Sequence, residues 1–173
     1  MKAAAVAVIL ALAAVQSDEE KATAMFKTYV DALRSADYEK AADQIHSKSI
    51  AKIRDRVLEA MDKSPVGNRD RFVKTLEYKD YEELKAAAPR DFFVRYLKNL
   101  KDLGDGPKQM MGAVEGSEWT IIGSLKKDDR IYVIVETTFT LGAEKHSMPA
   151  LYVAYKDGEA WKLAYRGETN IGK

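Results

Sequence analysis

Few side chains in this sequence have the type and spacing that catalysis or metal binding requires. The chain holds two histidines, His46 and His146, and no cysteine, which excludes disulfides, thiol nucleophiles and thiolate metal sites. Asp128 and Asp129 stand among lysines, where a solvated turn explains them better than a calcium loop does. The sequence also lacks a phosphate-binding glycine loop and a Gly-x-Ser-x-Gly nucleophile motif. We therefore predict no metal and no cofactor.

Helical periodicity dominates the chain between residues 18 and 100. An i, i+3, i+4, i+7 stripe predicts a helix from Asp18, which we expect to be its N-cap, to Leu33. Asp37 is expected to cap a second, shorter helix, with His46 near its C-terminal end, and Pro89 to open another. Further apolar residues predict a helix over residues 50–61. Residues 63–68 are predicted as a loop, while residues 69–88 fit either helix or strand.

From Glu118 onward the apolar period changes to two, which is typical of strands. We predict strands from Glu118, over 131–140, over 146–155 and over 160–166. The turn at 156–159 contains Asp-Gly, which favours a tight hairpin. The strands therefore form an antiparallel meander.

Residues 1–17 resemble a secretory signal in their order of charge and hydropathy. Lys2 precedes the apolar run 3–14, which is shorter than the roughly 20 residues that a membrane span needs. Small residues permit cleavage after Ala13 or after Ser17; a retained anchor or a buried helix is the alternative. We therefore expect a domain over 18–173, exported to the periplasm or the exterior, with no stable membrane span after cleavage. The net charge of +1, without a polybasic segment, excludes nucleic acid as an expected partner.

Several segments resemble nuclear-transport-factor-2-like domains. They are Phe26-x-x-Tyr29-Val30-x-x-Leu33, residues 36–42 and the last predicted strand pair, residues 150–166. The resemblance implies an α+β fold in which N-terminal helices pack in the concave face of a strongly curved antiparallel sheet, a cone also described as cystatin-like. It also implies frequent dimerisation through the sheet and a small apolar pocket. Members of this superfamily include isomerases, dehydratases and many non-catalytic binding domains, so the fold alone does not give the function.

The resemblance also indicates where catalytic residues would lie if the chain is an enzyme. The positions expected to face the interior of such a cone are Tyr29, Glu136 and Tyr152. A carboxylate in an apolar chamber has a raised pKa, which suits a general base. The structural alternatives are a core role for the tyrosines and a cross-strand pair for the glutamate. The catalytic residues stay open.

Apolar residues occur on both faces of the two central predicted strands. The helices can cover only one of these faces. The other must be covered by a partner, a ligand or the sheet's own twist. We assign this candidate dimer or ligand face to Tyr132, Ile134, Met148, Ala150, Tyr152 and Ala154. The predicted function is an exported, non-catalytic module that binds a small apolar ligand or assembles with protein, in the latter case as a homodimer. The alternative is a pocket enzyme using general acid–base catalysis on a small apolar substrate.

Overall fold

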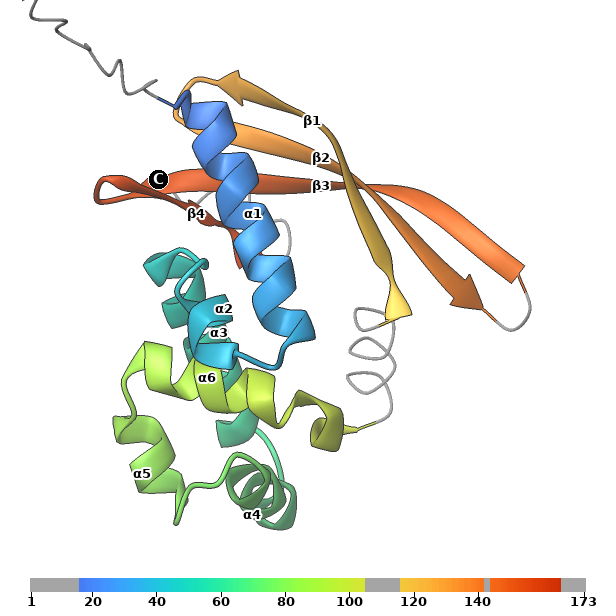
Figure 1. Ribbon diagram of the computed structural model, residues 1–173. Helices are drawn as coiled ribbons and strands as arrows, with labels where there is room; N and C mark the ends of the chain where they lie inside the picture. The colour runs from blue at the N-terminus through green and yellow to red at the C-terminus, as the bar shows by residue number, and fades with distance from the viewer. Residues whose placement is uncertain (1–15, 105–115, 142–143, 166–173) are drawn as a thin grey trace, which may run out of the picture.

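The structure is a computed structural model that describes residues 16–104, 116–141 and 144–165. Helices occupy the first part of the chain and a single antiparallel sheet the second, with the strands in the order β1-β2-β3-β4 (Figure 1). The elements are α1 (Asp18–Arg34), α2 (Tyr38–Ala42), α3 (Ser47–Asp62), α4 (Val66–Thr75), α5 (Tyr81–Ala86), α6 (Pro89–Lys98), a 3-10 helix (Leu100–Leu103), β1 (Glu118–Lys127), β2 (Arg130–Leu141), β3 (Glu144–Asp157) and β4 (Ala160–Leu163). The predicted α+β class and the predicted meander are confirmed.

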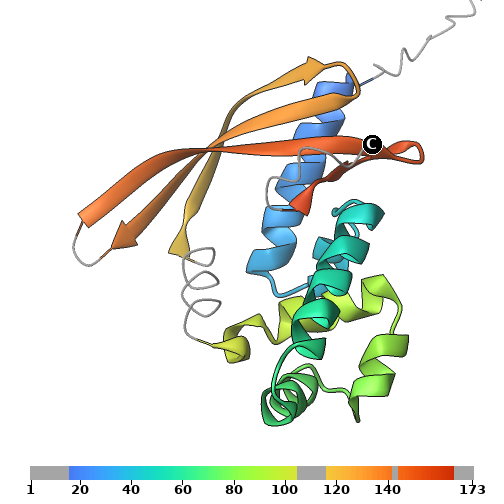
Figure 2. The ribbon, with the colours of Figure 1, turned by 180° about the vertical axis from the view of Figure 1, so that it is seen from behind.

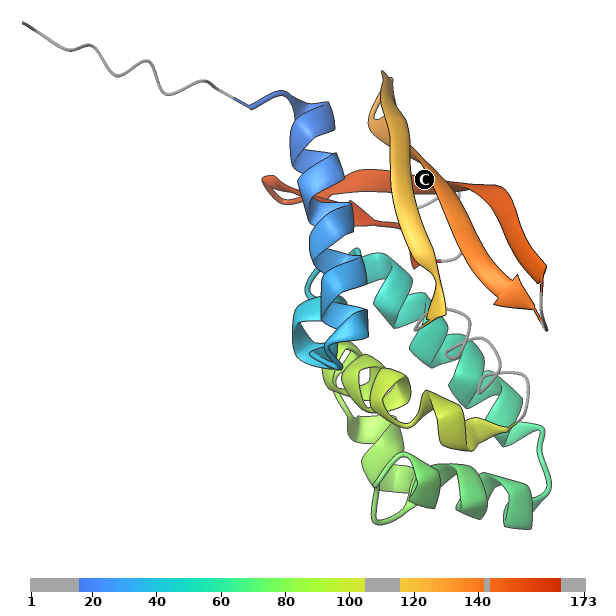
Figure 3. The ribbon, with the colours of Figure 1, turned by 45° about the vertical axis from the view of Figure 1, so that its right-hand side comes forward.

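Helix α1 lies across the concave side of the sheet, and its predicted apolar stripe is buried there (Figure 3). The N-cap is Ser17, one residue before the predicted cap, because Ser17 and Glu20 form a reciprocal capping box. In it the Glu20 amide donates to Ser17 Oγ at 3.1 Å and the Ser17 amide donates to Glu20 Oε2 at 2.8 Å. Asp18 instead accepts hydrogen bonds from Lys126 at 2.6 Å and from Trp161 Nε1 at 2.9 Å. The start of α1 is therefore joined to both tight hairpins of the sheet.

The main core lies between α1 and the inner face of the sheet. Ile131, Val133 and Val135 alternate along β2, and all three are fully buried. Phe26 of α1 packs on the ring of Tyr152 with centroids 4.6 Å apart and on Trp119 at 5.8 Å. The far end of the β2–β3 hairpin projects beyond the helical layer (Figures 1 and 2).

Residues 63–88 differ from the prediction. The expected loop over 63–68 ends early, since α4 begins at Val66 with Pro65 as its N-cap. The ambiguous stretch holds most of α4 and all of α5, whose start is capped by a hydrogen bond from the Glu83 amide to the Asp80 carboxylate at 2.9 Å. These two short helices enclose a second core with the N-terminal part of α6, made of Val73, Leu76, Tyr78, Leu84 and Phe92. Helix α5 is too short and α4 buries too few apolar residues to show a clear apolar period, which explains the ambiguity.

Most of the predicted signal, residues 1–15, lies outside the described residues, as do 142–143 of the β2–β3 turn and Arg166 at the end of the last predicted strand. Within the described parts of the chain, no helix has the length and hydropathy to cross a membrane.

Candidate functional site

The three candidate catalytic residues do not meet in one site. Tyr29 is buried in the α1 core, and Tyr152 lies on the inner face of the sheet against Phe26. Glu136 is exposed and pairs with Pro149, whereas Tyr152 pairs with Val133. Because side chains alternate along a strand, Glu136 and Tyr152 lie on opposite faces. The expectation that Glu136 faces the interior is therefore wrong.

Tyr152 has the most perturbed environment of the three. Burial raises the pKa of its hydroxyl to about 12, since the charged phenolate is poorly solvated there. The group therefore stays protonated at physiological pH. It is available as a hydrogen-bond donor and not as a base.

The six residues of the predicted dimer or ligand face are divided between the two faces of the sheet. Tyr132 pairs with Val153 and Ile134 with Leu151, so Tyr132 and Ile134 lie on the outer face. The other four residues lie on the inner side of the sheet. The buried residues Val135, Val133 and Ile131 pair with Ala150, Tyr152 and Ala154, and Met148 is likewise at an even position of β3. The register pairs odd positions of β2 with even positions of β3, a relation that the sequence pattern of each strand does not reveal.

The outer face carries an apolar patch that replaces the predicted set. Ile134 is 36% exposed and its cross-strand neighbour Leu151 57% exposed. On β1, Leu125 pairs with Tyr132 and is 59% exposed. We call Leu125, Ile134 and Leu151 the outer patch.

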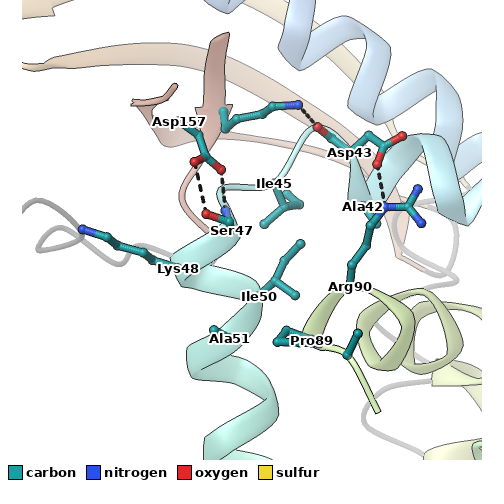
Figure 4. Close-up of a pocket in the computed structure, with 12 residues that line it drawn as sticks. Ala42, Asp43, Ile45, Ser47, Lys48, Ile50, Ala51, Pro89, Arg90 and Asp157 are labelled. Atoms are coloured by element: carbon teal, nitrogen blue, oxygen red, sulfur yellow. Dashed lines mark hydrogen bonds and ion pairs between the residues drawn. The ribbon is translucent and has the colours of Figure 1, made fainter. Parts of the chain in front are cut away.

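A groove of about 570 Å³ opens where α2, the first turns of α3, the start of α6 and the β3–β4 hairpin meet (Figure 4). Its floor is apolar and its rim is polar or charged. The floor consists of Ala42, Ile45, Ile50, Ala51, Ala88 and Pro89, and the rim of Asp43, Ser47, Lys48, Arg90, Asp157 and Lys162. We call it the α3–α6 groove. Its volume falls within the range of about 300–1,000 Å³ that is typical of small-molecule sites.

Backbone pairing between the α2–α3 linker and β4 positions this groove. Ile45 forms a parallel bridge with Leu163, in which the Leu163 amide donates to the Gln44 carbonyl and the His46 amide to the Leu163 carbonyl, both at 2.8 Å. The linker therefore covers the free edge of β4. One wall of the groove is built on this long-range contact.

His46 is the N-cap of α3, not a residue at a helix C-terminus as predicted. Its Nδ1 accepts a hydrogen bond from the Lys48 amide at 3.1 Å, and its Nε2 lies 3.2 Å from the Lys156 carbonyl. An Nδ1 that accepts and an Nε2 that donates define a neutral imidazole with one tautomer. His46 is 5% exposed and joins α3 to the β3–β4 hairpin.

The rim carboxylates are already compensated within the protein. Asp157 accepts from the Ser47 amide at 2.8 Å and from the Ser47 hydroxyl at 3.1 Å. Partial burial raises the pKa of Asp157, but these two bonds and the nearby charge of Lys162 outweigh it, so the pKa is lowered overall. Asp43 accepts from Arg90 Nε at 2.8 Å, and its main-chain carbonyl accepts from Lys162 Nζ.

The groove has no activated nucleophile among its described residues. His46, Ser47 and Asp157 are neighbours, but the Ser47 hydroxyl is bonded to Asp157 while both nitrogens of His46 face main-chain groups. That arrangement lacks the serine–histidine contact on which a Ser-His-Asp triad depends. The described residues also contain no group of three acidic or histidine side chains that could hold a metal ion.

Comparisons with known proteins identify little. No family model matches the sequence, and no curated protein matches it. One solved structure, titled Rd1NTF2_05 and carrying five substitutions, covers 83% of this chain and 91% of its own at 13% identity with a TM-score of 0.43. The arrangement of helices and sheet described above stands independently of that likeness.

Sequence reasoning singled out none of the residues that line the groove as a site. The prediction that His46 lies near a helix C-terminus is wrong, since it caps the start of α3, whereas Asp157 does lie at the predicted hairpin turn. No pattern in the sequence indicated that Ser47 and Asp157, which are 110 residues apart along the chain, meet at one wall of the groove. The Asp-Gly turn at 156–159 was the one local sequence signal that falls on the groove.

Proposed function

We propose that this protein is an exported, non-catalytic module of nuclear-transport-factor-2-like type that binds a small, largely apolar ligand in the α3–α6 groove. The observation that carries the proposal is the composition of the groove. An apolar floor lies under a rim whose carboxylates are compensated within the protein, which is typical of a binding site.

The enzymatic alternative has less support. Its proposed carboxylate, Glu136, lies on the outer face, away from Tyr152. An acid–base pair must lie within hydrogen-bond reach of one substrate. Glu136→Gln should therefore leave ligand binding unchanged.

A blocking substitution tests the proposal. Ala51 of α3 lines the groove, and a phenylalanine ring there would occupy part of its volume. We expect isothermal titration calorimetry to detect binding of 1-decanol, a neutral probe with an apolar chain. Ala51→Phe should weaken that binding by about tenfold or more. Ala60→Phe places the same ring at an exposed position of the same helix and should have no effect. Equal binding of 1-decanol by all three proteins would contradict a binding role for the groove.

Self-association is a second candidate function, favoured by the outer patch. A two-fold dimer would bury the Ile134–Leu151 pair against its own copy, since such interfaces are self-complementary. Sedimentation velocity should show a dimer at micromolar concentration that Leu151→Lys dissociates. Val66→Lys alters an equally exposed apolar residue on α4, at 60% exposure, and should leave the dimer intact. A wild-type monomer would rule out this second function.

Export is proposed from the sequence of residues 1–17. A mature chain beginning at Asp18 would lose the Ser17 cap, which favours cleavage after Ala13. The intact mass of the protein secreted by its own host distinguishes the two cleavage sites, and a mass that retains residues 1–17 would exclude both.

A further inference from the structure

The ligand class of the α3–α6 groove follows from the charges at one end of its floor. Arg90 at the start of α6 and Lys162 on β4 come from distant parts of the chain, yet both bind Asp43. Arg90 binds the carboxylate, and Lys162 binds the main-chain carbonyl. Two cationic groups therefore converge where the apolar floor ends.

Both cations keep hydrogen-bonding capacity that the described residues do not use. Arg90 donates through Nε to Asp43, and its Nη2 lies 3.5 Å from the Glu39 carbonyl and 3.9 Å from the exposed Glu39 carboxylate, both long contacts. The side chain is 49% exposed, so its outer guanidinium edge faces solvent. Lys162 has three N–H groups, of which the described contacts use one. A guanidinium edge presents parallel donors that fit a carboxylate.

The acidic side chains of the rim are less available. Both Asp157 oxygens accept hydrogen bonds from Ser47, at the positively polarised first residue of α3. Asp43 is held by the guanidinium of Arg90. Lys48 also belongs to the rim but points away from the groove (Figure 4). The unused capacity is therefore that of cationic donors.

The apolar floor begins beside these donors. Ile45 and Ile50 are 4% and 5% exposed, and Pro89 lies next to Arg90 across from them (Figure 4). A ligand with a charged head and an aliphatic or aromatic tail would place its head at Arg90 and Lys162 and its tail over these residues. Partially buried charge pairs discriminate strongly by sign, because like charges repel at close range.

We propose that the groove selects amphiphilic monoanions, namely carboxylates with an apolar tail. This inference depends on the proposed function, since it names the ligand class of the same groove. A matched series of probes tests the anion preference separately from binding in the groove. Decanoate, 1-decanol and decyltrimethylammonium share one chain length and differ in the charge of the head, and each is titrated calorimetrically into protein purified from its own host.

Decanoate should bind about tenfold more tightly than 1-decanol, and the ammonium probe more weakly than either. Arg90→Met keeps the apolar stem of the side chain but removes the guanidinium. It should lower the affinity for decanoate by about tenfold and leave 1-decanol unchanged. Arg90→Lys should restore only part of the preference, because lysine lacks the planar fork. Arg71→Met, on the exposed side of α4, removes an equal charge elsewhere and should change nothing.

Each result supports or overturns a distinct statement. Equal affinity for decanoate and 1-decanol, or tightest binding of the ammonium probe, overturns the anion preference while the groove remains a binding site. Absence of binding by every probe overturns the proposed function itself. Lys162→Met gives an independent variant if Arg90→Met unfolds, with the same expected loss for decanoate alone.

Discussion

Replacing Asp157 by asparagine tests how the wall of the α3–α6 groove is held. The carboxylate accepts two hydrogen bonds from Ser47, at 2.8 and 3.1 Å, and so joins the β3–β4 hairpin to the start of α3. An asparagine can accept only through one oxygen, since its amide nitrogen is a donor. The substitution also removes a negative charge from a helix N-terminus.

The expected loss of stability follows from the lost hydrogen bond and the lost charge. A hydrogen bond to a charged group contributes about 1.5–3 kcal/mol when it is buried. Asp157 is partly exposed, so solvent screening reduces that contribution, and we expect Asp157→Asn to lower the free energy of unfolding by about 1 kcal/mol. Urea denaturation followed by circular dichroism measures the change. Glu159→Gln, two residues further in the same hairpin, removes an exposed carboxylate and should change stability by less than about 0.5 kcal/mol.

The effect should depend on pH with a definite sign. Burial raises the pKa of Asp157, but the Ser47 bonds and the charge of Lys162 lower it overall below the ordinary value of 3.8. A group whose pKa is lowered by folding stabilises the protein above its unfolded-state pKa and loses that contribution as pH falls through the folded-state pKa. The difference between wild type and Asp157→Asn should therefore be full near neutral pH and shrink below 3.8. Equal stability near neutral pH, or a difference that persists at the lowest pH where the protein stays folded, would refute this account.

Three other substitutions test the packing and the backbone. Phe26→Ala removes the ring that α1 packs on the sheet and should lower the free energy of unfolding by about 3–5 kcal/mol, measured by urea denaturation. Lys27→Ala, at the exposed neighbouring position, should have little effect. A loss below about 1 kcal/mol for Phe26→Ala would contradict the core described above. Ser17→Ala deletes the capping box and should cost about 1 kcal/mol, measurable as reduced helical content or a lower melting temperature; an unchanged melting temperature would show that the cap is not needed. Gly158→Ala places a side chain on a residue with φ of +63° and should destabilise the protein by about 1 kcal/mol. Gly67→Ala, inside α4 with open space around it, should stabilise the protein. Stability changes of the same sign for both would contradict the backbone argument.

Local periodicity was enough to predict the elements that are long and amphipathic. Helix α1 and the hairpin-linked strands each carry several repeats of their apolar period, so their existence and order follow from the sequence. The capping residue of α1 was displaced by one position, because a serine and a glutamate three residues apart bind each other more effectively than Asp18 alone. Helix α5 is too short, and α4 buries too few apolar residues, to show such repeats.

The relation between elements was not predictable in the same way. The faces of β2 and β3 depend on whether odd positions pair with odd or even ones, and that parity is set by the hairpin register. The candidate face was mixed for this reason. Glu136 was assigned to the interior although the alternation of β2 places it on the face opposite the buried Ile131, Val133 and Val135. The groove combines residues from α2, α3, α6 and the last hairpin, and long-range contacts alone bring them together.

The most direct test of the binding proposal is a two-dimensional NMR titration of the isotope-labelled protein with decanoate. We predict that the largest shifts of backbone amides occur at Ile45, Ile50, Ala51 and Arg90, around the α3–α6 groove. Shifts concentrated at Ile134 and Leu151 on the outer patch, or no shifts at all, would contradict it.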